Sequence, residues 1–201
     1  MALGVGEVTA MEMVSAYSVF ANGGYLKKPY FIDKIIDSQG RKVKLSSALM
    51  NAEVPRIIDP RNAFIMTDML KEVINSGTAR KAKRLKRNDI AGKTGTTNNL
   101  IDAWFAGYNP DIVTVTWMGF PQPKPLGDKE TGSRAALPIW IDYMEPILED
   151  YPIKMLVEPE GILPLKVKES DGTLAGPNEP GIYEYFYDEF LPKDNAYFMI
   201  N

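Results

Sequence analysis

Hydrophobic and polar positions recur with two different periods along the chain, and together these periods predict an α+β fold. Near the start, apolar residues at helical spacing predict a helix that runs to about Ala21. Thr9 followed by Glu12 forms a capping box at its beginning, and Asn22-Gly23-Gly24 provides the stop. Further along, segments rich in β-branched residues have the character of strands.

Two further helices are predicted. One begins at Asp59-Pro60, where aspartate caps the helix and proline occupies its first turn, and it ends near Asn75-Ser76-Gly77. Its buried side is formed by Phe64, Met66, Met69, Leu70 and Val73. The other helix runs from Ala135 to Leu148. We expect it to be broken or shortened near Pro146, because proline removes a backbone donor inside a helix.

Five strands are predicted in two groups. Tyr30 to Asp37 and Arg41 to Leu45 indicate a hairpin. Ile90 to Thr97, Ala103 to Tyr108 and Ile112 to Phe120 lie close enough in sequence to form an antiparallel meander. These elements, with the helices, make residues 1–148 one structural portion.

The remaining residues, 149–201, have a different texture. Prolines recur among scattered acidic and aromatic residues, which indicates a tail or a small irregular extension. Its aromatic residues can anchor it on the body of the protein or on a partner, and coverage of a local apolar patch is the favoured interpretation. They are Tyr183, Tyr185, Phe186, Tyr187 and Phe190.

Composition narrows the chemistry. With 45% hydrophobic and 24% charged residues, the 201-residue chain has the composition of a globular protein. It contains no histidine and no cysteine, which excludes a Ser-His-Asp triad, a Cys-His pair and the usual zinc sites within it. No apolar run reaches the length that a membrane span requires.

A cluster of basic residues between positions 80 and 87 raises the possibility of nucleic-acid binding. Ala79, Ala82 and Leu85 fall between the charges at helical intervals, so the cations are predicted to form the solvated side of a short amphipathic helix. The net charge of −3 also differs from that of typical nucleic-acid-binding domains. We therefore expect no nucleic-acid partner, and contact with anionic lipid or cell-wall polymer is the lesser alternative.

The segment Lys93-Thr94-Gly95-Thr96-Thr97 is the strongest candidate for a functional site. On an extended backbone Thr94 and Thr96 share one face, whereas Lys93, Gly95 and Thr97 share the other. Glycine is a poor strand former, so Gly92 and Gly95 indicate close approach of a ligand or another backbone. A substrate carboxylate can then bind the lysine and both hydroxyls while its backbone pairs with the strand edge. The pattern indicates recognition of a peptide end.

The alternative interpretation is a polar edge strand, in which the lysine discourages aggregation and the glycines mark a bulge. A Lys-Thr-Gly triplet alone is too short a motif to decide between these interpretations. The sequence around the triplet favours the functional one.

Lys93 to Thr97 resembles the third motif of the penicillin-recognising serine transpeptidases, which include penicillin-binding proteins and class A β-lactamases. Four further runs are similar, in order and spacing, to class A penicillin-binding proteins: Met1 to Thr9, Ala16 to Gly24, Gly77-Thr78-Ala79 and Ala135 to Trp140. The resemblance covers residues 1 to about 148. It implies a partial β-lactamase-like transpeptidase fold, an antiparallel sheet with flanking helices that is incomplete in this chain.

Two motifs of that family do not occur in the chain. The family carries a nucleophilic serine in Ser-x-x-Lys and a second motif, Ser-x-Asn, both upstream of the lysine-threonine-glycine strand. All serines here lack lysine three residues on and asparagine two residues on: Ser15, Ser18, Ser38, Ser46, Ser47, Ser76, Ser133 and Ser170. We therefore expect a carboxyl-terminal piece of a longer protein, without a nucleophile and inactive alone. We also expect an unpaired strand edge and bare apolar surface.

The resemblance implies part of a peptidoglycan DD-transpeptidase that crosslinks stem peptides through a serine acyl-enzyme and is acylated by β-lactams. Lys93 would act electrostatically and bind the serine of the second motif, and Thr94 and Thr96 would hold the substrate carboxylate. The backbone N–H of Thr96 would supply half of the oxyanion hole, and Gly95 and Thr97 would complete the substrate-binding strand. No cofactor and no metal are expected.

The expected partners are peptidoglycan stem peptides, β-lactam antibiotics and the upstream half of the same domain. The parent would also carry a glycosyltransferase domain and lie at the periplasmic face of the inner membrane, attached by an anchor outside this chain. The alternative is a non-catalytic module that uses the same scaffold to sense peptidoglycan or a β-lactam. A serine β-lactamase agrees less well with the runs at Met1 and Gly77.

Overall fold

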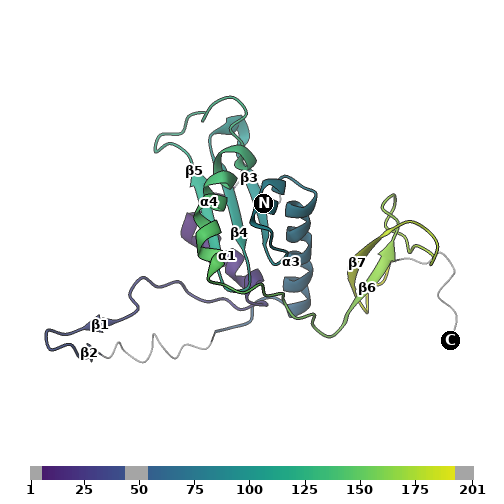
Figure 1. Cartoon of the computed structure of the whole chain (residues 1–201), viewed down its shortest axis with the longest axis horizontal. Coiled ribbons are helices and arrows are strands. Elements are labelled where there is room, and N and C mark those ends of the chain that lie inside the picture. Colours follow the sequence, from purple (N-terminus) through teal and green to yellow (C-terminus); the bar gives the residue numbers. More distant parts are fainter. Residues whose placement is uncertain (1–5, 44–53, 193–201) are drawn as a thin grey trace.

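The structure is a computed structural model that describes residues 6–43 and 54–192. Its centre is a three-stranded antiparallel sheet of β3 (Ala91–Thr96), β4 (Ala103–Tyr108) and β5 (Val113–Met118), in that order (Figure 1). The predicted meander is therefore confirmed, with the outer strands slightly shorter than expected. A 3₁₀ turn, η2 (Asn98–Leu100), joins β3 to β4.

The register of the sheet decides which side chains share a face. Gly95 pairs with Trp104, which pairs with Trp117 on β5. Directly opposed residues of an antiparallel pair point to the same side. One face therefore carries Lys93 and Gly95 of β3 beside both tryptophans, and Thr94 lies on the opposite face.

Helices cover both faces of the sheet. α1 (Ala10–Ala21) begins with the predicted capping box, and α3 (Pro60–Asn75) begins at the predicted Asp59 cap. α1 packs on the face of Tyr108, and α3 runs beside β3 (Figure 1). Where α1 and α3 meet the sheet, Ala21, Leu70, Ala91 and Tyr108 form a small buried cluster.

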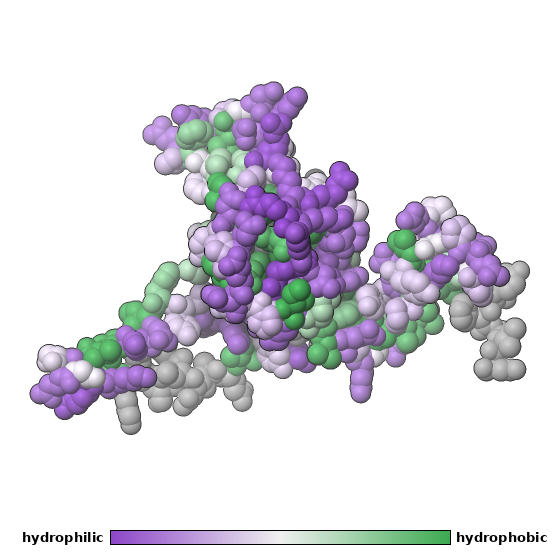
Figure 2. Space-filling model, viewed as in Figure 1, coloured by the Kyte–Doolittle hydropathy of each residue, from purple (hydrophilic) through white to green (hydrophobic). Residues whose placement is uncertain are grey.

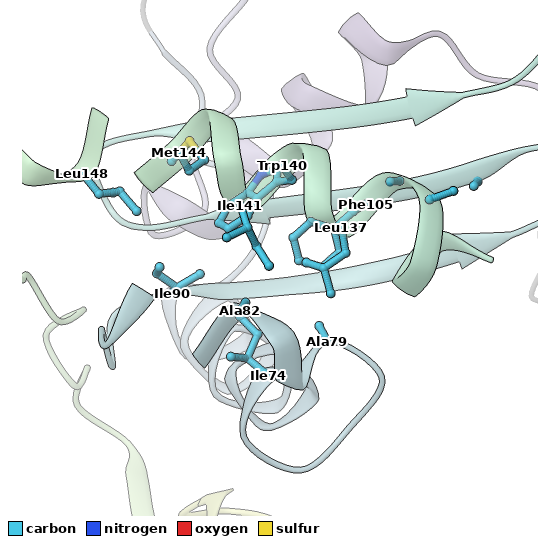
Figure 3. Packing of buried hydrophobic residues seen from close by; sticks show 13 residues of the cluster. Ile74, Ala79, Ala82, Ile90, Phe105, Leu137, Trp140, Ile141, Met144 and Leu148 are labelled. Carbon is cyan, nitrogen blue, oxygen red and sulfur yellow. The ribbon is translucent and has the colours of Figure 1, made fainter. Parts of the chain in front are cut away.

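The opposite face is covered by α4 (Leu137–Glu149), which follows a π-helical turn, η3 (Gly132–Ala136). Figure 3 shows the α4 side chains packed over the strands, with Trp140 beside Phe105. The centroids of these two rings are 5.0 Å apart. The predicted break at Pro146 is wrong, because the helix continues to Glu149. Pro146 lies inside the helix and has no N–H to donate to the carbonyl four residues earlier, so α4 passes it with one hydrogen bond fewer.

The basic segment, predicted to be a short amphipathic helix, forms the 3₁₀ helix η1 (Arg80–Leu85). Ala79 and Ala82 are buried. Not all of its cations lie in solvent. Arg84 pairs with two carboxylates of α4. The Arg87 side chain, only 10% exposed, forms a bidentate pair with Asp89. The prediction that Arg87 belongs to a solvated face is therefore wrong.

Arg87 fastens the chain beyond α4 to the entrance of β3. Its guanidinium donates to the backbone carbonyls of Leu148, Tyr151 and Pro152 at 2.7 to 3.1 Å. Asp89 in turn accepts from the Lys154 N–H at 3.0 Å. These bonds satisfy the buried carboxylate and fix where the carboxyl-terminal extension leaves the body.

The predicted first hairpin is present but shorter than expected, with β1 (Ile35–Ile36) and β2 (Lys42–Val43). Residues 44 and 45 of its second strand lie outside the described residues. The predicted strand from Tyr30 is wrong, because that stretch has no strand partner. The arm projects from the body and exposes hydrophobic side chains, including 88% of Phe31 (Figures 1 and 2).

The extension contains a second hairpin, β6 (Ile162–Val167) and β7 (Ile182–Tyr187), so its description as irregular is wrong. Tyr185 packs edge-on against Phe64 of α3, with ring centroids 4.9 Å apart. Arg61 of α3 lies over Tyr187 and bonds both oxygens of Glu189. Part of the aromatic set thus covers the body, as the favoured interpretation held. The division of the chain into residues 1–148 and 149–201 stays a prediction.

Candidate functional site

Strand β3 has one hydrogen-bonded neighbour, β4, among the residues that the structure describes. The Thr97 N–H donates to the Asp102 carbonyl at 3.1 Å, so Thr97 faces β4. Backbone groups of an antiparallel edge strand alternate between the neighbour and the free side. The N–H and C=O groups of Thr94 and Thr96 therefore point to the edge that no described strand occupies.

Lys93 places a positive charge at this edge. Its side chain is exposed, and Nζ donates to the Thr94 carbonyl oxygen at 2.8 Å. Because that carbonyl points to the free side, the ammonium group lies over the edge rather than over the face of the sheet. An anionic group that approaches the edge meets this charge together with the outward N–H of Thr96.

The hydroxyls of Thr94 and Thr96 lie on the other face, where each has a partner. Thr94 Oγ1 is 2.6 Å from Thr78 Oγ1, and Thr96 Oγ1 accepts from the Gly132 N–H at 3.0 Å. Gly132 begins η3 and lies directly on the sheet, since a Cβ there would overlap the carbonyl oxygens of Gly95 and Trp104. This contact fixes η3 beside the candidate site.

Thr97 differs from the other predicted site residues, because its side chain is used within the protein. Thr97 Oγ1 accepts from the Asp102 N–H at 2.8 Å and closes the turn between β3 and β4. Asp102 also accepts from the Trp117 indole N–H at 2.9 Å. The structure therefore brings Lys93, Thr94 and Thr96 together at one edge and places Thr97 at the adjoining turn.

Thr78 is a polar residue of the site that the sequence reasoning did not assign. It lies between α3 and η1 and contacts Thr94 across 16 residues of sequence. A hydroxyl can accept two hydrogen bonds and donate one. Donation from Thr78 to Thr94 leaves the Thr94 proton available to a ligand. The Gly77-Thr78-Ala79 run, noted only for its resemblance, was the signal that pointed to it.

Residues 6–43 and 54–192 contain no cluster of three or more side chains arranged to hold a metal ion. Within the same ranges, no helix combines the length and hydropathy that crossing a bilayer requires.

The family model described as penicillin binding protein transpeptidase domain matches residues 1–145. This match covers both helices α1 and α3, the central sheet and most of α4.

Curated relatives extend the similarity into the carboxyl-terminal extension. Penicillin-binding protein 1A of Neisseria lactamica is 49% identical over 164 residues, which cover 81% of this chain and 21% of the relative. Penicillin-binding protein 1A of Pseudomonas aeruginosa is 40% identical over an alignment that covers 96% of this chain and 29% of the relative. The chain thus spans between about a fifth and three tenths of the length of these relatives.

Solved structures show the same arrangement. The 2.6 Å crystal structure of penicillin-binding protein 1A from Haemophilus influenzae matches with a TM-score of 0.88 at 33% identity, covering 96% of this chain and 34% of that one. The structure of the penicillin-binding protein PonA1 from Mycobacterium tuberculosis matches with a TM-score of 0.63 at 26% identity, covering 85% and 44%.

Proposed function

The chain belongs to the penicillin-binding protein transpeptidase family, and from this premise we propose that it forms the substrate-binding strand of a peptidoglycan DD-transpeptidase. The nucleophilic serine of that enzyme lies outside these 201 residues. A glycosyltransferase domain, membrane attachment and a position at the periplasmic face belong to the same proposal for the whole protein.

The proposed reaction is acyl transfer between two stem peptides. The serine oxygen attacks the carbonyl between the terminal D-alanines, forms an ester and releases the last D-alanine with the proton taken from the serine. An amine of a neighbouring stem then attacks the ester, forms the crosslink and restores the serine. A β-lactam acylates the same oxygen when the amide bond of its four-membered ring opens. The ring nitrogen becomes an amine that remains part of the acyl group on the serine.

Each group at the edge of β3 suits one part of this reaction. The Lys93 ammonium supplies positive potential where the substrate carboxylate and the serine of the second motif would approach. Thr94 and Thr96 supply hydroxyls for the carboxylate, with Thr78 orienting that of Thr94. The backbone groups of Thr94 and Thr96 face the free edge and can pair with the peptide, whereas those of Gly95 and Thr97, also predicted for this strand, face β4.

The observation that carries the proposal is the direction of the Thr96 N–H. It points away from β4, so it is available to a developing oxyanion beside the Lys93 charge. A second donor would come from the backbone of the missing serine. Removal of one such donor in other enzymes lowers the rate about 10² to 10³-fold.

A proline at position 96 tests this assignment. Thr96→Pro deletes the N–H, and because this group makes no bond to β4, the sheet ladder stays intact. In the complete gene product we expect acylation by a fluorescent penicillin to slow about 10² to 10³-fold. Thr96→Ala is the matched control, since it keeps the N–H and loses only the hydroxyl. Equal slowing in both variants would contradict an oxyanion role for the backbone.

A non-catalytic sensor of peptidoglycan or β-lactams is the second candidate. The observation that favours it is that Lys93 and Thr94 offer binding groups at the edge of β3, and a sensor requires binding alone. The sequence upstream in the same gene separates the two candidates. An intact Ser-x-x-Lys there supports the enzyme, and its loss supports the sensor.

A further inference from the structure

Trp104 and Trp117 form an aromatic pair on the face of the sheet that also carries Lys93. Their ring centroids are 6.1 Å apart, and the ring planes are inclined by 47°. Trp104 is half-buried, whereas 44% of Trp117 is exposed. α1 packs at the other end of this face, beside Tyr108, so the pair stands at the end of the sheet where β3 terminates.

The exposed ring of Trp117 is held in place. Its indole N–H donates to Asp102 Oδ1 at 2.9 Å, and the Asp102 N–H donates to Thr97 Oγ1 at 2.8 Å. Gly119 gives the ring its space, because a Cβ there would overlap the indole. A surface tryptophan whose only polar group is satisfied in this way presents a rigid apolar face to solvent.

The pair lies next to the site through Gly95. A Cβ at Gly95 would come within 3.1 Å of the Trp104 Cβ, so the absence of a side chain there leaves the tryptophan directly beside the edge strand. Neighbouring strands are about 4.8 Å apart, so Trp104 is one strand spacing from the charged edge and Trp117 two. Both rings therefore share the face of the sheet that carries the Lys93 side chain, and Trp104 is the nearer of the two to the edge where the Thr96 N–H points outward.

We propose that Trp104 and Trp117 bind the apolar side chain of the acyl donor whose carboxylate lies at the edge of β3, and that Trp117 determines specificity among acyl donors. The inference rests on the proposed function and deepens it. A ligand with an anionic group and an aryl or alkyl group on one rigid frame matches this surface in both charge and apolarity. β-Lactams with an aromatic side chain are ligands of this class.

Asp102 acts as a positioning residue in this arrangement. It bonds the indole N–H on one side and the turn after β3 on the other, so it ties the ring orientation to the end of the substrate strand. It touches no reacting atom. Thr97 has the same positioning role through its hydroxyl.

The test compares two β-lactams on the complete gene product. Benzylpenicillin carries an aromatic side chain, and 6-aminopenicillanic acid has the same ring system without it. We expect Trp117→Ala to lower the second-order acylation rate of benzylpenicillin about 10-fold and to leave that of 6-aminopenicillanic acid within about twofold. The control is Tyr143→Ala, which removes an exposed aromatic ring from α4 and should change neither rate.

Equal loss with both compounds, or loss with neither, would overturn the inference. If Trp117→Ala does not fold, Trp117→Phe and Trp117→Leu take its place, because both fill the position and only phenylalanine keeps an aromatic ring. The faster acylation by benzylpenicillin should then persist in Trp117→Phe and disappear in Trp117→Leu. The same ratio of the two acylation rates in both variants would overturn the inference. Acylation of the unmodified protein by neither compound would instead overturn the proposed function, and the inference with it.

Discussion

At the scale of single residues, the chemistry of the site depends on which atoms of β3 face β4 and which face outward. Thr97 uses its N–H within the sheet, and the alternation leaves that of Thr96 at the free edge. The same alternation separates the side chains, with Lys93 on one face and the two threonine hydroxyls on the other. A six-residue strand thereby places a cation, a backbone donor and two hydroxyls along one edge of the sheet.

The contact between the hydroxyls of Thr78 and Thr94 is expected to affect the rate of acylation. Thr78→Val keeps the shape of the side chain but removes the hydroxyl that lies 2.6 Å from Thr94 Oγ1. We expect acylation of the complete gene product by a fluorescent penicillin to slow about 3 to 10-fold, the effect of losing one modest hydrogen bond.

Thr78→Ser serves as its control, because serine retains the hydroxyl and should keep most of the rate. If valine and serine give the same rate, Thr78 does not orient Thr94.

Much of this site could be predicted from the sequence. Period two placed Thr94 and Thr96 together and Lys93 apart from them, because a strand admits no other arrangement. Thr78 and Trp117 could not be assigned, since both reach the site through tertiary packing. Thr97 was predicted to belong to the substrate-binding strand, and in the structure its hydroxyl accepts a hydrogen bond from Asp102 in the turn.

At the scale of elements, local signals located the ends of helices better than their interiors. The caps at Thr9 and Asp59 depend on contacts with the next few residues, which the sequence contains. Pro146 was expected to break α4, but Leu148 beyond it is buried in the core, so packing holds the last turn despite the lost hydrogen bond. The β6–β7 hairpin was missed because of its prolines, and Pro164 is tolerated since β6 has a neighbour on one side only among the described strands.

Carboxylates come close where β7 meets α3, and this contact predicts a dependence on pH. Asp68 and Glu72 of α3, Glu184 of β7 and Glu158 of the linker lie in this region, with Lys71 3.9 Å from Asp68. Burial raises the pKa of Asp68 against the opposing charge of Lys71. Burial, together with Asp68 and Glu72, raises the pKa of Glu184.

A raised carboxyl pKa means that the docked hairpin favours the protonated form. Docking is therefore strongest below the ordinary carboxyl values of 3.8 and 4.5 and weakens as the pH rises through the raised values. Glu189 opposes this trend at low pH, because Asp188 and Arg61 lower its pKa. We expect Glu184→Gln to flatten the loss of docking with rising pH.

Hydrogen exchange of the β7 amides, expressed relative to intrinsic rates at each pH, measures this effect. The control is Glu179→Gln. Glu179 is an exposed residue of the same extension, and its carboxylate pairs with Lys168. A pH profile that is the same for the unmodified protein and Glu184→Gln would show that these carboxylates do not govern docking.

At the scale of the whole molecule, the chain corresponds to one portion of a longer solved structure. It covers 34% of the chain of the Haemophilus influenzae structure and superposes on it with a TM-score of 0.88. The free edge of β3 and the exposed apolar arm around Phe31 are surfaces that a larger fold can cover. The missing motifs predicted an open strand edge and exposed apolar surface, but they could not show that the arm around Phe31 would be one of those surfaces.

In the proposed enzyme, these residues supply substrate-binding groups to a serine that lies elsewhere in the same protein. Labelling with a fluorescent penicillin, followed by a denaturing gel and intact mass, tests it most directly. We predict that the complete gene product is labelled and gains the mass of one penicillin, whereas the 22.5 kDa chain alone is not labelled. A covalent adduct on the 22.5 kDa chain, or no label on a complete product with an intact Ser-x-x-Lys, would contradict the account.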